Sequence, residues 1–163
     1  MNEGGIIVDC AIMDEAWRAL PGKKAMAKSL AAACLAACGV APSAEISLLF
    51  SSDSHVQDLN RRFRGQDRPT NVLSFPGPPP MAGLPVVLGD VVMAFATMQR
   101  QARGQNISLR QHTAHLIVHG ILHLLGHDHE HAGEAETMEA LETTILLQQG
   151  YAAPYTVAVE PDP

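Results

Sequence analysis

Residues 116–129 read Leu-Ile-Val-His-Gly-Ile-Leu-His-Leu-Leu-Gly-His-Asp-His, a run of large aliphatic side chains interrupted by histidines and two glycines. A helix that is apolar on every side is a buried helix, so this stretch predicts a helix at the centre of the fold. His119 and His123 are four residues apart and therefore project from the same face, one turn apart. Buried imidazoles need polar partners, and two ring nitrogens at this spacing can bind one metal ion.

The glycine that follows the aliphatic run predicts how a third ligand arrives. Gly126 is suited to a left-handed turn that ends the helix and folds the chain back along it, which brings His129 to the same ion. Three histidines leave a fourth position for water, as in catalytic zinc sites. We expect one Zn²⁺ ion, although Ni²⁺ or Cu²⁺ also suits three imidazoles. A cluster of ordinary histidines is the alternative, and it explains this spacing less well.

The spacing of His119, His123, Gly126 and His129 matches the pattern of the metzincin metallopeptidases except at one position. Gly120 stands where those enzymes carry the glutamate that acts as general base. Without that carboxylate, peptide hydrolysis lacks its usual proton acceptor. A metallopeptidase is therefore disfavoured, and a metallopeptidase-like or small-substrate metal-dependent hydrolase is the alternative function.

The rest of the chain predicts strands in the first half and long helices in the second. The expected strands are 5–12, 45–51, 70–75 and 86–96, and the last of these is interrupted at Gly89 and Asp90. The expected helices are 14–38, 53–63, 108–125 and 134–149. The first helix has a break at Pro21, and Asp53 is expected to cap the second. Residues 76–85 read as an exposed proline-rich loop. This order favours an α+β fold, with a small mixed β-sheet packed against helices that include the zincin-like metal helix. We expect residues 1–163 to form a single domain with a loose tail from about residue 152.

Composition indicates a globular protein of the cytoplasm. The chain has 163 residues, of which 47% are hydrophobic and 17% charged, which excludes a disordered chain. The longest run of low polarity, residues 29–42, is too short to cross a bilayer, and the N-terminus lacks the basic segment of a secretory signal. Three cysteines, Cys10, Cys34 and Cys38, give no disulfide framework. Cys34 and Cys38 share a helix face, and small core residues are favoured over metal ligands there.

The charge of the chain is distributed unevenly. Residues 1–110 hold all 11 basic and 9 acidic residues, a net of +2, whereas residues 111–163 hold 8 acidic and no basic residues, a net of −8, and the two give the total of −6. That total argues weakly against a nucleic-acid binder. Four arginines at 61, 62, 64 and 68 can still bind phosphates, because salt screening confines their field to about 10 Å. Arginines that simply face solvent are an equal alternative.

Segment 119–129 closely resembles the signature of the YbeY family, which are bacterial metal-dependent endoribonucleases. Residues 63–76 (Phe-Arg-Gly-Gln-Asp-Arg-Pro-Thr-Asn-Val-Leu-Ser-Phe-Pro), 88–90 and 138–142 are similar to three further signatures of that family. The resemblance implies cleavage of single-stranded RNA in 16S rRNA 3′-end maturation and ribosome quality control, with the ribosome or its small subunit as partner. It also implies His119, His123 and His129 as the metal ligands and Arg64 as the arginine needed for activity.

Two features depart from the family pattern. The first is His127, which stands where relatives often have Tyr and is either a candidate catalytic residue or a residue that only fills the same space. The second is the loop 76–85, which replaces a segment that is more often acidic in relatives. Zinc lowers the pKa of a bound water to about 7, and Arg64 can stabilise phosphate charge with a forked pair of hydrogen bonds. A zinc-bound hydroxide, His127 and Asp128 are the candidates for the proton acceptor.

A third hypothesis for the function is a non-enzymatic, ribosome-associated factor in which the metal is structural.

The positions of three other residues in the sequence predict their surroundings. His115 lies one turn before His119 and is expected to line the metal cleft, whereas His112 is expected at a solvated position. Asp90 is a candidate buried partner for a ligand imidazole or an arginine.

Overall fold

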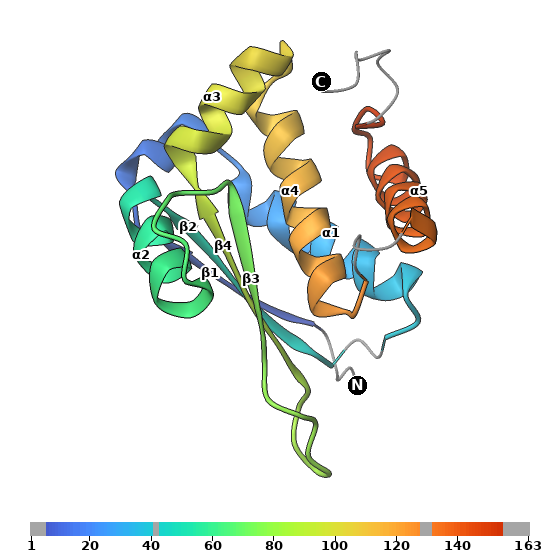
Figure 1. Cartoon of the computed structure of the whole chain (residues 1–163). Coiled ribbons are helices and arrows are strands. Elements are labelled where there is room, and N and C mark those ends of the chain that lie inside the picture. The colour runs from blue at the N-terminus through green and yellow to red at the C-terminus, as the bar shows by residue number, and fades with distance from the viewer. Residues whose placement is uncertain (1–5, 41–42, 128–131, 155–163) are drawn as a thin grey trace.

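The computed structural model describes residues 6–40, 43–127 and 132–154 (Figure 1). Its elements are β1 (Ile7–Ile12), the 3-10 helix η1 (Glu15–Ala19), α1 (Lys23–Ala37), β2 (Glu45–Ser51), α2 (Asp53–Arg64), β3 (Val72–Pro76), β4 (Val87–Ala94), α3 (Phe95–Gln105), α4 (Leu109–Leu124) and α5 (Ala132–Gln148). The strands form one sheet in the order β1-β2-β4-β3. The β1–β2 and β2–β4 pairs are parallel and the β3–β4 pair is antiparallel. The predicted α+β fold with a small mixed sheet is confirmed.

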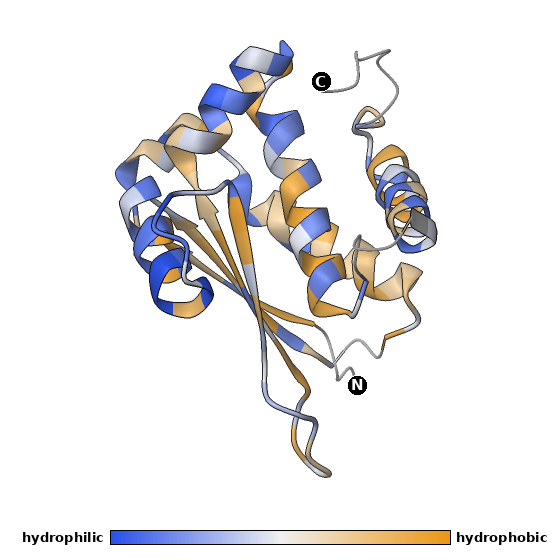
Figure 2. Ribbon diagram, viewed as in Figure 1, coloured by the Kyte–Doolittle hydropathy of each residue, from blue (hydrophilic) through white to orange (hydrophobic). Residues whose placement is uncertain are grey.

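Helices cover both faces of the sheet (Figure 1). On one face α1, α4 and α5 enclose the larger core, which includes Trp17, Leu48 and Ile117. On the other face α2 packs over β3 and β4 through a smaller cluster around Val56 and Leu73. The strands are largely hydrophobic and α2 is mainly hydrophilic (Figure 2), because α2 rests on the sheet along only one side.

Helix α4 crosses the centre of the molecule, as its apolar sequence predicts. Ser108 caps its start, where the hydroxyl accepts a hydrogen bond from the backbone N–H of Gln111 at 3.0 Å. Its end is set by Gly126, whose φ of 98° lies in the left-handed region. The backbone N–H of His127 then returns to the carbonyl of Leu122 at 3.0 Å. The predicted left-handed helix end at Gly126 is therefore present, and the path of the chain from residue 128 lies outside the described residues.

Helix α3 is the element that the sequence failed to predict. Residues 86–96 were expected to form a strand, but β4 ends at Ala94 and α3 begins at Phe95. Ala94 has no side chain that can cap a helix, and the cap comes from Asp53 instead, whose carboxylate accepts from the N–H and hydroxyl of Thr97 at 2.9 and 2.7 Å. Asp53 was expected to cap the helix that it begins, and this was wrong, because Ser52 caps α2.

The ends and loops complete the fold. The expected break at Gly89 and Asp90 does not end β4, but the register with β2 shifts there, because Glu45 pairs with Val87 and Ile46 pairs with Gly89. The proline-rich loop between β3 and β4 is exposed, as expected. The expected loose tail falls mostly outside the described residues, and its first residue, Ala152, is held at both backbone N and O by Gln111. Within the described ranges, no helix has the length and apolarity needed to cross a membrane.

Candidate metal centre

Three histidines line one face of α4 at four-residue spacing: His115, His119 and His123, each partly buried. The Nε2 atoms of His119 and His123 lie 3.2 Å apart. Two nitrogens bound to one tetrahedral zinc at 2.0–2.1 Å lie about 3.4 Å apart. The two imidazoles are therefore already placed so that both Nε2 atoms can reach one ion.

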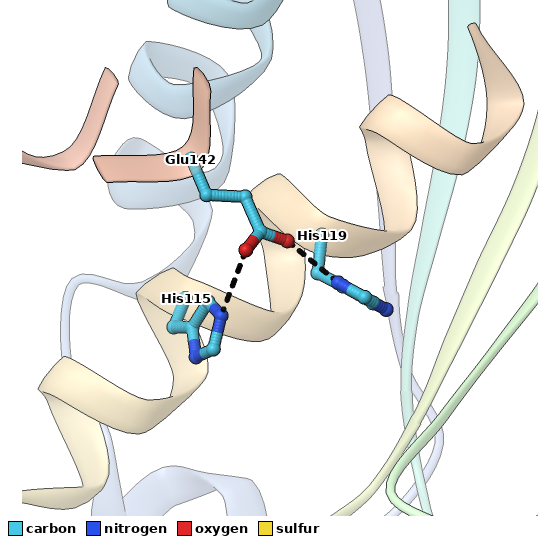
Figure 3. Close-up of side chains that lie close together, drawn as sticks. All are labelled: His115, His119 and Glu142. Carbon is cyan, nitrogen blue, oxygen red and sulfur yellow. Dashed lines mark hydrogen bonds and ion pairs between the residues drawn. The ribbon is translucent and has the colours of Figure 1, made fainter. Parts of the chain in front are cut away.

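A buried carboxylate holds the first of these rings. Glu142 on α5 is 0% exposed, and its Oε2 lies 2.6 Å from Nδ1 of His119, while its Oε1 lies 3.4 Å from Nε2 of His115 (Figure 3). An ionised Glu142 can only accept hydrogen bonds, so with the carboxylate in that form this contact requires Nδ1 of His119 to be the donor. Nε2 of His119 then keeps its lone pair for a metal. Carboxylates that orient ligand histidines in this way are a regular feature of zinc sites.

The same group offers a second way to hold an ion. One ligand atom from each of His115, His119 and Glu142 lies within 4.8 Å of the others. However, the 2.6 Å between Glu142 and His119 is a hydrogen-bond length, shorter than the separation of two ligands on one zinc. The geometry therefore favours Glu142 as a partner that orients His119, with Nε2 of His119 and His123 directed at the ion. The residues fit the metal that the sequence predicted.

Glu142 is the functional residue that sequence reasoning missed. It lies in the last helix beside the buried residues Met138, Ile145 and Leu146. A charged side chain on the buried face of a helix is rarely found without a partner, so this position was the available signal. His115, which was expected to line the metal cleft, contacts Glu142 and so belongs to the same group of side chains as His119.

The other predicted site residues on the loop after α4 are only partly placed. His129, the predicted third ligand, and Asp128 lie outside the described residues. The Nε2 atom of His127 lies 3.7 Å from the sulfur of Cys38, at the end of α1. Cys34 is fully buried, as expected of a core residue, and burial raises the pKa of its thiol. Cys38 is partly buried and packs against the same core.

Arg64, the predicted catalytic arginine, is the last residue of α2 and lies beside β3 at the edge of the sheet. Its guanidinium donates to the backbone oxygen of Ser74 on β3 at 2.8 Å. The hydroxyl of Ser74 in turn donates to the carbonyl of Gly120 at 3.0 Å, and Gly120 directly follows His119. Two hydrogen bonds, joined through Ser74, therefore connect Arg64 to the backbone beside His119, the first predicted metal ligand.

Gly120 is a packing residue. A Cβ atom there would lie 2.7 Å from Cγ1 of Val91 and 3.2 Å from the hydroxyl of Ser74. Real Cβ atoms do not approach other atoms so closely, so only glycine lets α4 lie this near β3 and β4. A glutamate at this position would have no room, which removes the general base of the metallopeptidases on steric grounds.

Two expectations about polar residues were wrong. His112 is buried, and its Nε2 lies 2.9 Å from Oε1 of Gln101 on α3. Burial, with His115 adding to the effect, lowers the pKa of His112 to about 4. Asp90 is exposed on β4 and is no buried partner of an imidazole or arginine within the described part of the chain.

Comparisons with known proteins give matches over most of the chain. A family model described as Endoribonuclease YbeY matches residues 14–150. A protein named Endoribonuclease YbeY from Methylocella silvestris is 44% identical over 151 residues, covering 91% of this chain and 85% of its own. Proteins of the same name from Rhodospirillum rubrum and Azorhizobium caulinodans are 48% and 42% identical, covering 90% and 94% of this chain and 80% and 98% of their own.

The fold has a counterpart among solved structures. The solution structure of a Thermotoga maritima protein aligns with a TM-score of 0.54 at 22% identity, covering 88% of this chain and 91% of its own. At this identity the likeness supports the fold alone. The family match spans residues 14–150, which include α4 and α5 with the candidate metal centre, as well as α2 with Arg64. The chain belongs to the YbeY family of endoribonucleases.

Proposed function

We propose that this protein is a zinc-dependent endoribonuclease of the cytoplasm that cleaves single-stranded RNA in 16S rRNA 3′-end maturation and ribosome quality control. Its relatives are named as endoribonucleases, and they match this chain over most of their length. The whole chain acts as one domain in this proposal. The observation that carries it is the pair of Nε2 atoms of His119 and His123, 3.2 Å apart and oriented by Glu142, in a chain of this family.

In the proposed site His119, His123 and His129 hold the ion, with Glu142 fixing the orientation of the first ring. A zinc ion bound there supplies a water of lowered pKa and a Lewis acid for a phosphoryl oxygen. Ni²⁺ and Cu²⁺ are possible substitutes, since the donor set is nitrogen only. His119 and His123 lie on the buried helix α4, which keeps their ring nitrogens in place without rearrangement when RNA binds.

Arg64 is proposed to stabilise the charge that develops on the scissile phosphate. Its link to Ser74 uses one of five N–H donors and fixes the guanidinium at the β3 edge. A forked pair of the other donors suits two phosphate oxygens. His127 is proposed to move a proton, and this requires its Nε2 to leave the sulfur of Cys38. Asp128 and the water at the metal are the other candidates for the proton acceptor.

The experiment combines metal analysis of the purified protein with cleavage of ribosomal RNA. Wild type is expected to hold about one zinc per chain and to cut single-stranded regions. A His123→Ala variant is expected to lose both metal and cleavage. His55→Ala is the control, because His55 lies on α2 and bonds to the Ser51 hydroxyl, away from α4.

Three results would contradict the proposal. Full cleavage by His123→Ala with metal retained would remove the site from the reaction. Hydrolysis of peptides or small esters with no cleavage of RNA would favour the metallohydrolase alternative. Binding to the small ribosomal subunit without any hydrolysis, and with a metal that does not exchange its water for azide, would favour a structural role for the metal.

A further inference from the structure

An exposed aromatic ring stands at the end of α2, beside the edge of the sheet. Phe63 is 64% exposed and is the one aromatic among the large, exposed hydrophobic residues of the described chain. Its ring meets the ring of Phe75 on β3 edge to face, with centroids 5.5 Å apart. Because Phe75 is partly buried in the cluster under α2, it fixes the orientation of the exposed ring. The ring of Phe63 is therefore both accessible and held in place.

One guanidinium group lies near each of the two rings. The Cζ atom of Arg62 lies 5.7 Å from the centroid of Phe63, and that of Arg64 lies 5.4 Å from the centroid of Phe75. Asp58 pairs with both Arg61 and Arg62, yet residues 58–68 hold four arginines against two aspartates, a net of +2. In a chain of net charge −6 this segment is a local site of attraction for anions.

The ordinary explanation is that arginine side chains cover a surface phenylalanine. Cover of that kind should hide most of the ring, but Phe63 keeps 64% of its surface exposed. The side chain of Arg62 is itself 57% exposed, so it can yield the ring face to another planar group. Aromatic rings combined with cationic groups are how proteins bind single-stranded nucleic acids, by base stacking and phosphate contacts.

We propose that Phe63, supported by Phe75 and flanked by Arg62 and Arg64, is a stacking site for one unpaired base of the RNA substrate. The inference rests on the proposed function and adds a binding subsite to it. Arg64 connects the stacking site to the candidate metal centre. Its guanidinium lies over Phe75 and also donates to the backbone oxygen of Ser74, whose hydroxyl bonds to α4. An RNA strand that crosses the edge of β3 can thus place a base on Phe63 and a phosphate at Arg64.

A tryptophan at position 63 provides a direct test of stacking. The chain has one tryptophan, Trp17, which is 0% exposed and donates to the Ser51 carbonyl, so its emission is a constant background. In Phe63→Trp, a single-stranded RNA octamer is expected to quench the new emission in stopped-flow, before cleavage occurs. An octamer with the same phosphates but abasic sugars is expected to leave it unquenched. Equal quenching by both oligonucleotides would overturn the proposal.

Affinity measurements give an independent test. Phe63→Ala is expected to raise KM and Kd for single-stranded RNA about tenfold with kcat within about twofold, in the range found for loss of one stacked base. Phe63→Tyr is expected to behave as wild type, because its ring also stacks. Leu147→Ala is the matched control, since Leu147 is 56% exposed on α5. Equal losses for Phe63→Ala with intact and abasic RNA, or a defect confined to binding of the small subunit, would overturn the proposal.

The outcome separates this inference from the proposed nuclease activity. If wild type cuts no RNA but Phe63→Trp is quenched only by the oligonucleotide with bases, the stacking site stands and the nuclease proposal fails. If wild type cuts RNA and Phe63→Ala has normal KM and Kd, the nuclease proposal stands and the stacking site fails.

Discussion

Replacing Glu142 with glutamine is the sharpest test of how the metal centre is built. Glu142 is fully buried and lies 2.6 Å from Nδ1 of His119, a geometry typical of a charge-assisted hydrogen bond. Such a bond contributes about 1.5–3 kcal/mol, against about 1 kcal/mol for a neutral one. Glu142→Gln keeps the size of the side chain and an oxygen that can accept from Nδ1, but it removes the charge. The expected loss is the difference between these two values, about 0.5–2 kcal/mol.

That loss corresponds to a metal dissociation constant raised about two- to thirtyfold. The upper part of this range overlaps the effect of about 10–100-fold found when partners of ligand histidines are replaced. The assay is a titration of metal-free protein with zinc against a competing chelator, with circular dichroism to check that the fold is retained. His115→Ala is the companion variant, because His115 contacts the other carboxylate oxygen at 3.4 Å.

The two ways of holding an ion predict different results for these variants. If Glu142 orients His119, His115→Ala changes zinc affinity by only a fewfold and His123→Ala abolishes binding. If His115, His119 and Glu142 are the ligands, His115→Ala and Glu142→Gln both abolish binding and His123→Ala has little effect. Zinc affinity within twofold of wild type in Glu142→Gln would refute the reasoning that the buried carboxylate tunes the site.

The remaining predictions concern the catalytic arginine, the packing of α4 and the buried histidine. Arg64→Ala is expected to lower RNA cleavage about 100-fold, as for loss of one group that stabilises transition-state charge, with metal content unchanged; Arg18→Ala, at an exposed position, is the control, and metal loss in Arg64→Ala would show the residue is misplaced. Gly120→Ala is expected to cost about 1–3 kcal/mol in urea unfolding, because its Cβ would lie 2.7 Å from Val91; an unchanged midpoint would refute the close packing. His112 has a folded pKa of about 4, below its unfolded value, so the free energy of unfolding should fall as the pH drops from about 6.5 to 4. In His112→Asn that part of the pH dependence should disappear, and an unchanged slope would contradict the assignment.

The central helix and the histidine pair were predictable because their signals are local. The aliphatic run predicts burial, Ser108 and Gly126 mark the ends of the helix, and the spacing of His119 and His123 follows from helical geometry. The family resemblance depends on the same short segments. Each of these features can be recognised within a few turns of chain, without knowing what lies against it.

Helix α3 could not be recognised in that way. Its cap is Asp53, which lies 44 residues earlier in the chain than Thr97, so the residue next to the helix start carries no signal. The missing α3 also affects the prediction for His112. This residue was expected to be solvated, but it lies against α3 and is buried. Gln101 of that helix is its hydrogen-bond partner. A missed element thus changed the predicted environment of a residue in a different, correctly predicted helix.

The sequence by itself determined which residues can bind a metal and which helix presents them, because period and side-chain chemistry are properties of adjacent residues. Only the tertiary structure decided what surrounds them. It brought Glu142 from α5 to His119, left no space for a side chain at Gly120, and placed Arg64 at the sheet edge between Phe75 and Ser74. The physical reason is that orientation, close contact and burial depend on how separate elements pack, and no local pattern records that packing.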